Sequence, residues 1–95
     1  MRAQVQQDAA IIAVTVDEQL VFSDGEQPGF NLASTDDLAV QIQLVLKAVP
    51  NKQFVVKADR MVRYQLVDKV LDELRRNGAK NIGLLTAQRP PTRKG

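Results

Sequence analysis

Two amphipathic segments constrain the fold of this chain more than any other feature of its sequence. Apolar residues recur at helical spacing from Leu38 to Val49 and again from Val67 to Leu74. Each stripe covers one side of a helix, so each helix must bury that side against another layer. The stripes are Leu38, Ile42, Val45, Leu46 and Val49, then Val67, Val70, Leu71 and Leu74. Short β-branched runs flank both helices, which predicts a sheet as the second layer.

Local signals set the ends of both helices. Residues 34–37 (STDD) are typical of a helix start, because hydroxyls cap free amides and carboxylates suit the positive end of the helix dipole. Pro50 ends the first helix. The second helix is expected over about residues 63–77, with Gly78 as the left-handed residue that follows it.

Four short runs predict strands because they are rich in β-branched and other apolar residues. They are residues 11–16, 20–23, 53–58 and 81–86. In the first run, Ile12, Val14 and Val16 are expected to face the core. Residues 25–29 are expected to form a loop, since they contain two glycines and a proline. The expected element order is therefore β-β-α-β-α-β.

This order predicts a two-layer α/β domain of the α+β kind, with both helices packed on one face of a small mixed sheet. The length of 95 residues suits a single domain, which we place at residues 10–86. Residues 1–9 are expected to be a flexible tether, and residues 87–95 a flexible basic tail. The other sheet face would be uncovered, and an apolar set there predicts a contact surface. That set is Ile11, Val21, Val55 and Leu85.

The composition excludes most enzyme classes. The chain has no Cys and no His, which excludes disulfides, thiolate or imidazole metal sites and the Ser-His-Asp triad. Gly25 and Gly29 lack the Lys-Ser/Thr ending of a phosphate loop. Adjacent carboxylates at 36–37 and 72–73 point about 100° apart on a helix, so neither pair is placed for acid–base catalysis. We therefore expect no enzymatic activity, no metal site and no cofactor.

The charge of the chain is unevenly distributed. Residues 17–37 hold six acidic side chains and no basic ones, whereas residues 38–95 hold 12 basic and 4 acidic side chains. This polarity either orients a partner or reflects two oppositely charged solvated faces. Asp17, Glu18 and Asp24 could ligate a hard cation, but their spacing is not that of a calcium loop. Nucleic-acid binding is not expected, because the four aromatic residues do not cluster as a stacking platform.

The segment after the third predicted strand is a candidate binding site. In a parallel unit it lies at the carboxyl end of a strand, where open sheets tend to bind ligands. The candidate residues are Asp59, Arg60, Arg63 and Tyr64. In a purely structural alternative, Asp59 ties the strand–helix loop and Tyr64 packs its ring with the hydroxyl outward.

The last predicted strand is a candidate interface with a second copy or a partner. It is short and apolar, and a free sheet edge offers unpaired amides and carbonyls to another strand. The candidate residues are Asn81, Ile82, Leu84, Leu85 and Thr86. The alternative, that Ile82 and Leu84 are ordinary core residues, stays open at this point.

Several segments occur in the order found in one known family. The matching segments are residues 54–59 (FVVKAD), Tyr64, residues 67–74 (VDKVLDEL), residues 77–79 (NGA) and residues 81–86 (NIGLLT). They resemble the carboxyl-terminal half of the ExbD/TolR family, and with the strand at residues 12–17 and the helix containing Leu38 the resemblance spans residues 10–86. Members of the family often carry Gly after the Asp that ends the first strand, where this chain has Glu18 and Gln19.

The resemblance implies a role in a membrane motor. ExbD/TolR proteins are small inner-membrane subunits with one transmembrane helix, which bears an essential Asp, and a periplasmic domain. That domain forms a homodimer and transmits motion from an ExbB/TolQ-type proton channel to a TonB- or TolA-like protein.

By this resemblance the chain is the periplasmic part of a longer protein anchored in the bacterial inner membrane, and the proton-carrying Asp lies outside it. TolR-type members also contact peptidoglycan. The alternatives are a peptidoglycan-binding anchor domain and a small nucleic-acid-binding domain.

Overall fold

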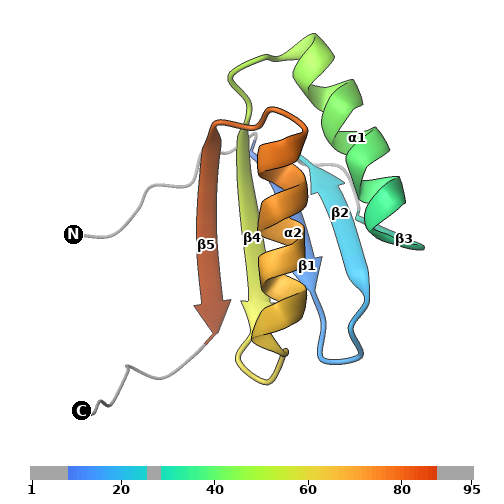
Figure 1. Cartoon of the computed structure of the whole chain (residues 1–95), viewed down its shortest axis with the longest axis vertical. Helices are drawn as coiled ribbons and strands as arrows, with labels where there is room; N and C mark the ends of the chain where they lie inside the picture. Colours follow the sequence, from blue (N-terminus) through green and yellow to red (C-terminus); the bar gives the residue numbers. More distant parts are fainter. Residues whose placement is uncertain (1–8, 26–28, 88–95) are drawn as a thin grey trace, which may run out of the picture.

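The computed structural model describes residues 9–25 and 29–87 of the chain. They form a five-stranded mixed sheet in the order β3-β2-β1-β4-β5, with two helices (Figure 1). The strands are β1 (Ala10–Val14), β2 (Leu20–Asp24), β3 (Phe30–Leu32), β4 (Gln53–Asp59) and β5 (Asn81–Ala87), and the helices are α1 (Thr35–Ala48) and α2 (Tyr64–Arg76). The β4 strand is parallel to both β1 and β5, whereas β2 is antiparallel to β1 and β3.

Both helices lie on the same face of this sheet, as predicted. Figure 1 shows α2 in front of β4 and β1, with α1 beside it on the side of β2 and β3. The core lies between the layers, where Ile12, Phe54, Leu38, Ile42 and Leu74 are fully buried. The two-layer fold class is therefore confirmed.

The apolar stripes of the two helices are buried to different extents. All four stripe residues of α2 are buried. In α1 only Leu38 and Ile42 are buried, whereas Val45 and Leu46 are partly buried against the core. Val49 follows the helix as its C-cap and is 44% exposed.

The helix ends follow the predicted local signals. The Asp37 amide donates to Ser34 Oγ at 3.4 Å, and Asp37 Oδ2 accepts from the Ala33 amide at 3.2 Å. The first bond satisfies an amide that the first turn of α1 leaves free, and the second fixes the residue that precedes the Ser34 cap. After α2, Gly78 takes φ +97°, and the Ala79 amide donates to the Leu74 carbonyl at 3.0 Å. That is the Schellman geometry, and it turns the buried Ala79 back onto the core.

Two parts of the strand prediction were wrong. The structure adds β3, whose Phe30 ring packs against Phe22 at a centroid distance of 5.8 Å. Three residues are too few to show a period, and Gly29 before the strand and Asn31 within it are typical of a loop. Val16 was expected in the core but is 55% exposed, because β1 ends at Val14 and residues 15–19 form the turn to β2.

The strand ends also differ slightly from the expectation, since β2, β4 and β5 each extend one residue further than predicted. The tether predicted over residues 1–9 and the basic tail predicted over residues 87–95 lie mostly outside the described residues. Ala9 and Ala87 are the described residues at their borders, and Ala9 is 2% exposed.

Gly78 and Gly83 form a matched pair for testing the turn after α2. A Cβ on either would meet its nearest neighbour at 3.9 Å, so space is equivalent, but only Gly78 has a positive φ. Gly78→Ala is expected to destabilise the chain by about 1–2 kcal/mol, because an L side chain is strained in the left-handed region. In urea unfolding Gly83→Ala should stay within about 0.5 kcal/mol of the original chain. Equal losses in the two variants would contradict this account of the turn.

Candidate functional site

The β5 strand forms one edge of the sheet. It is last in the strand order, so among the described strands it pairs only with β4. The pairing is parallel and runs from Gln53 opposite Asn81 to Asp59 opposite Ala87. The outer side of β5 therefore carries a row of backbone groups that no other described strand engages. Such an edge is a template for a further strand.

The side chains of β5 alternate between the two faces of the sheet. Ile82 and Leu84 lie opposite Phe54 and Val56 and so share the helix-covered face. Ile82 is partly buried and packs against the core, whereas Leu84 is 46% exposed. Leu85 lies on the other face and is 39% exposed.

The two remaining candidates of the predicted interface lie at the ends of the strand. Asn81 begins β5 and is exposed. The Thr86 backbone pairs opposite Ala58. Leu84 and Leu85 are therefore the members of the candidate set that offer exposed apolar surface.

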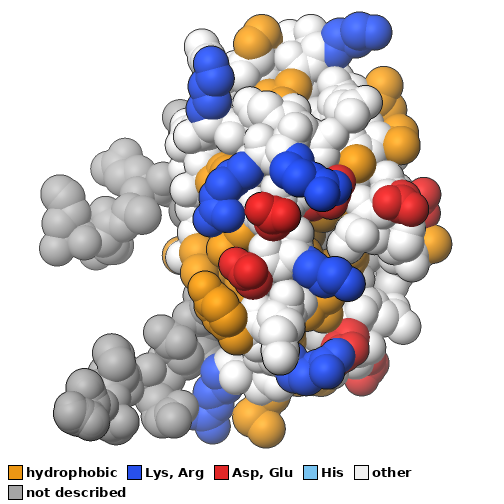
Figure 2. All heavy atoms as spheres, in the orientation of Figure 1, with side chains coloured by type: hydrophobic (Ala, Val, Ile, Leu, Met, Phe, Trp, Pro, Cys, Tyr) orange, Lys and Arg blue, Asp and Glu red, His pale blue; other side chains and the backbone are white. Residues whose placement is uncertain are grey.

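A groove runs along the junction of α2 and β5. It consists of two hollows that meet at Leu84, and we call it the α2–β5 groove. The first hollow, about 460 Å³, is lined by Leu71, Arg75, Ala79, Lys80, Ile82, Gly83 and Leu84. The second, about 340 Å³, is lined by Ala58, Asp59, Arg60, Val62, Tyr64, Val67 and Leu84. Figure 2 shows hydrophobic surface between α2 and the β5 edge, with a cationic side chain beyond one end.

The segment from Asp59 to Tyr64 forms the end of this groove. As predicted, it follows the carboxyl end of β4. Asp59 Oδ1 accepts a hydrogen bond from the Met61 amide at 2.9 Å, and the Asp59 carbonyl accepts from the Val62 amide at 2.9 Å. The structural alternative was thus correct for Asp59, which ties the loop. It was wrong for Tyr64, which is 70% exposed and lines the groove instead of packing its ring.

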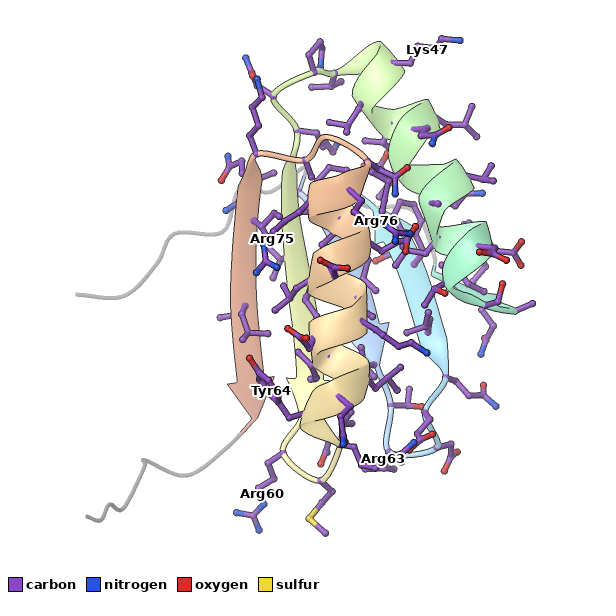
Figure 3. The ribbon with its side chains drawn as sticks, in the orientation of Figure 1. Lys47, Arg60, Arg63, Tyr64, Arg75 and Arg76 are labelled. Atoms are coloured by element: carbon purple, nitrogen blue, oxygen red, sulfur yellow. The ribbon has the colours of Figure 1, made fainter. Side chains whose placement is uncertain are left out.

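Arg63 points away from the groove and joins the loop to the β1–β2 turn. Its guanidinium donates to both carboxylate oxygens of Glu18, at 2.7 Å from Nε and 3.0 Å from Nη2. Figure 3 shows Arg60 and Tyr64 on the β5 side of the loop and Arg63 on the other side. The structure therefore brings Asp59, Arg60 and Tyr64 together with Leu84, but not Arg63.

The Glu18–Arg63 pair accounts for the residue type at position 18. Glu18 has φ +65°, a conformation that favours glycine. Glu18 therefore has a strained backbone conformation, but its side chain forms a bidentate ion pair with Arg63. This pair links the β1–β2 turn to the loop between β4 and α2.

Two substitutions at position 18 separate these effects. Glu18→Ala keeps the strain and loses the ion pair, so it should destabilise the chain by roughly 0.5–1 kcal/mol. Glu18→Gly loses the pair but relieves the strain, so its free energy of unfolding should lie above that of Glu18→Ala by about 1 kcal/mol. Thermal unfolding of both variants measures the difference. A Gly variant no more stable than the Ala variant would show that the positive φ carries no cost.

The face of the sheet away from the helices carries the predicted apolar set. The registers place Ile11 beside Val55, Val21 beside Ala13, and Leu85 beside Lys57. No described helix or strand covers this face. Val55 of β4 lies between Ile11 of β1 and Gly83 of β5 and is nevertheless only 1% exposed. The exposed Leu85 joins this face to the β5 edge.

The acidic residues considered as cation ligands have other roles. Glu18 pairs with Arg63, and Asp24 pairs with Lys52 Nζ at 2.8 Å. Within residues 9–25 and 29–87, no group of three or more acidic side chains could hold a metal ion. Neither helix in this part of the chain has the length and hydrophobicity that a membrane span requires.

The β5 edge and the groove beside it indicate the general class of protein to which this chain belongs. An edge strand with exposed leucines and a groove beside it, lined by both apolar and charged side chains, are typical of a binding domain. Comparison with protein families then identifies the chain. The model of the biopolymer transport protein ExbD/TolR family matches residues 2–89, so the chain belongs to that family.

The family assignment carries several consequences. ExbD/TolR proteins are non-enzymatic subunits of Ton and Tol motors, and the family implies ExbB/TolQ-type and TonB/TolA-type partners. The resemblance based on residues 10–86 is thus confirmed. A search of curated proteins found no match to this chain.

Proposed function

We propose that this chain is the periplasmic, dimerising and force-transmitting domain of a proton-motive-force-driven inner-membrane motor. It couples an ExbB/TolQ-type channel to a TonB- or TolA-like protein. In the full-length protein, a membrane-spanning helix outside these residues anchors the domain to the inner membrane. The observation that carries the proposal is the free β5 edge with the exposed Leu84 and Leu85 beside it.

The β5 edge suits a contact between two copies. A two-fold axis beside the strand would pair β5 of one protomer with the same strand of the other and extend the sheet. Leu84 and Leu85 lie on opposite faces of the strand, so each would cover part of the neighbouring protomer on its own face. Backbone pairing supplies affinity, and these leucines set the register.

The same edge suits the transmission of force. The β5 strand is joined to β4 over all seven of its residues, and β4 runs through the core. A force along β5 therefore acts on all the backbone hydrogen bonds between β4 and β5 at once, instead of breaking them one at a time. A partner attached to this edge transmits its load to β4, where Phe54, Val55 and Val56 are buried.

Peptidoglycan is the second candidate partner. Arg75 and Lys80 line one hollow of the α2–β5 groove and could attract anionic polymer groups. Binding through exposed cations weakens as salt rises, because attraction between charges at a surface is screened over about 8–10 Å. Retention on purified cell wall that did not depend on salt would argue against this contact.

Leu84→Arg tests the proposed interface. The substitution places a charge beside the edge strand, so self-association measured by sedimentation should weaken at least tenfold, equivalent to about 1.4 kcal/mol. Leu84 is 46% exposed, so circular dichroism and the free energy of unfolding should change little.

Val49→Arg is the matched control for Leu84→Arg. Val49 is 44% exposed and lies beyond the end of α1, so the control should associate as the original chain does. Equal association of all three chains, or no association of the original chain, would overturn the dimer. If Leu84→Arg unfolds the protein, Leu84→Gln repeats the test without a charge.

A further inference from the structure

The α1 helix carries a second surface that the proposed function does not use. Asp36, Val40, Leu44 and Lys47 recur every three or four residues, so they lie along one side of the helix. This side is opposite the buried Leu38. We call these four residues the outer stripe of α1. Val40 is 53% exposed and Leu44 is 58% exposed.

The charges at the two ends of the outer stripe have opposite signs. Asp36 lies in the first turn of α1 and Lys47 in the last. Within the part of the chain that the structure describes, neither forms an ion pair. Figure 2 shows hydrophobic side chains along the outer margin of α1, with acidic side chains toward one end, and Figure 3 labels Lys47 at the other.

The order of residues in the stripe is self-complementary. Val40 and Leu44 are centred on position 42 of the sequence. Asp36 and Lys47 are centred half a residue away, which is less than about 1 Å along the helix. A two-fold axis at this point pairs Val40 with the partner's Leu44 and Asp36 with the partner's Lys47. Antiparallel helices also bring the positive end of one dipole to the negative end of the other.

We propose that the outer stripe of α1 binds the same stripe of a second copy of this chain as an antiparallel helix pair. The charge complementarity selects a second copy over a membrane surface, because Asp36 and Asp37 repel anionic lipid. A contact confined to one side of a helix about 21 Å long falls in the small class of interfaces. Its dissociation constant is therefore expected on the order of 0.1–1 mM.

This contact is separate from the β5 edge. Two different self-complementary contacts on one chain join more than two copies, whereas β5 alone joins two. The inference does not depend on the function of the family, since it rests on the spacing, exposure and charges of α1.

A charge exchange tests the proposal, and it is done in the Leu84→Arg chain so that β5 association is reduced. Dilution from about 2 to 0.05 mM, followed by NMR shifts of α1 amides, spans the expected dissociation constant. Lys47→Glu should weaken association at least about fivefold, because it places Glu opposite the partner's Asp36. The double variant Asp36→Lys, Lys47→Glu should restore it, since opposite charges again meet across the axis.

Lys69→Glu is the matched control, because Lys69 is an exposed cation on α2 away from the stripe. It should leave the association of α1 unchanged. Concentration-independent α1 shifts, equal weakening by Lys47→Glu and Lys69→Glu, or failure of the double variant to restore association would each overturn the proposal. These outcomes are independent of whether Leu84→Arg affects β5.

Mixed cysteine variants test the register, since the chain has no native Cys. Val40→Cys mixed with Leu44→Cys should cross-link faster than either variant with itself, because the proposed axis pairs these two positions. Cross-linking at equal rates in all combinations would contradict the antiparallel register.

Discussion

The parallel pairing of β4 with both β1 and β5 is the constraint on which the rest of the structure depends. It places β4 inside the sheet, between β1 and β5, and Phe54, Val55 and Val56 of this strand are almost completely buried. Parallel strands need a crossover, and α2 provides it between β4 and β5. The helix covers one face, and β5 becomes the last of the described strands, none of which pairs with its outer side. The candidate interface is thus a direct result of how the core is built.

The loops show which side chains serve the fold and which remain for binding. Arg63 and Asp59 were both candidates for a site, yet one closes a turn with Glu18 and the other holds the strand–helix loop. Tyr64 and Leu84 have no such role and line the α2–β5 groove. Of the charged groups that line the groove, Asp59 holds the loop, whereas Arg60, Arg75 and Lys80 join the apolar side chains in the groove lining.

Periodicity predicted the fold from the sequence well, but it could not predict how exposed each side chain is. The α2 stripe, the Ser34 cap and Gly78 follow from local rules, and all were correct. The β3 strand was missed because three residues carry no period, and Val16 was misplaced because the turn begins before the β-branched run ends. The exposure of Leu84 and the Glu18–Arg63 pair, 45 residues apart, depend on tertiary packing that spacing does not encode.

Hydrogen–deuterium exchange of the β5 amides, measured across protein concentration, tests the central claim most directly. If the free edge of β5 is the contact between copies, exchange at residues 81–87 should slow as association increases, because new strand pairing protects outward amides. Exchange in β3, the other edge of the sheet, should stay constant. Association with unchanged exchange in β5 would show that the protein uses another surface and would contradict the account.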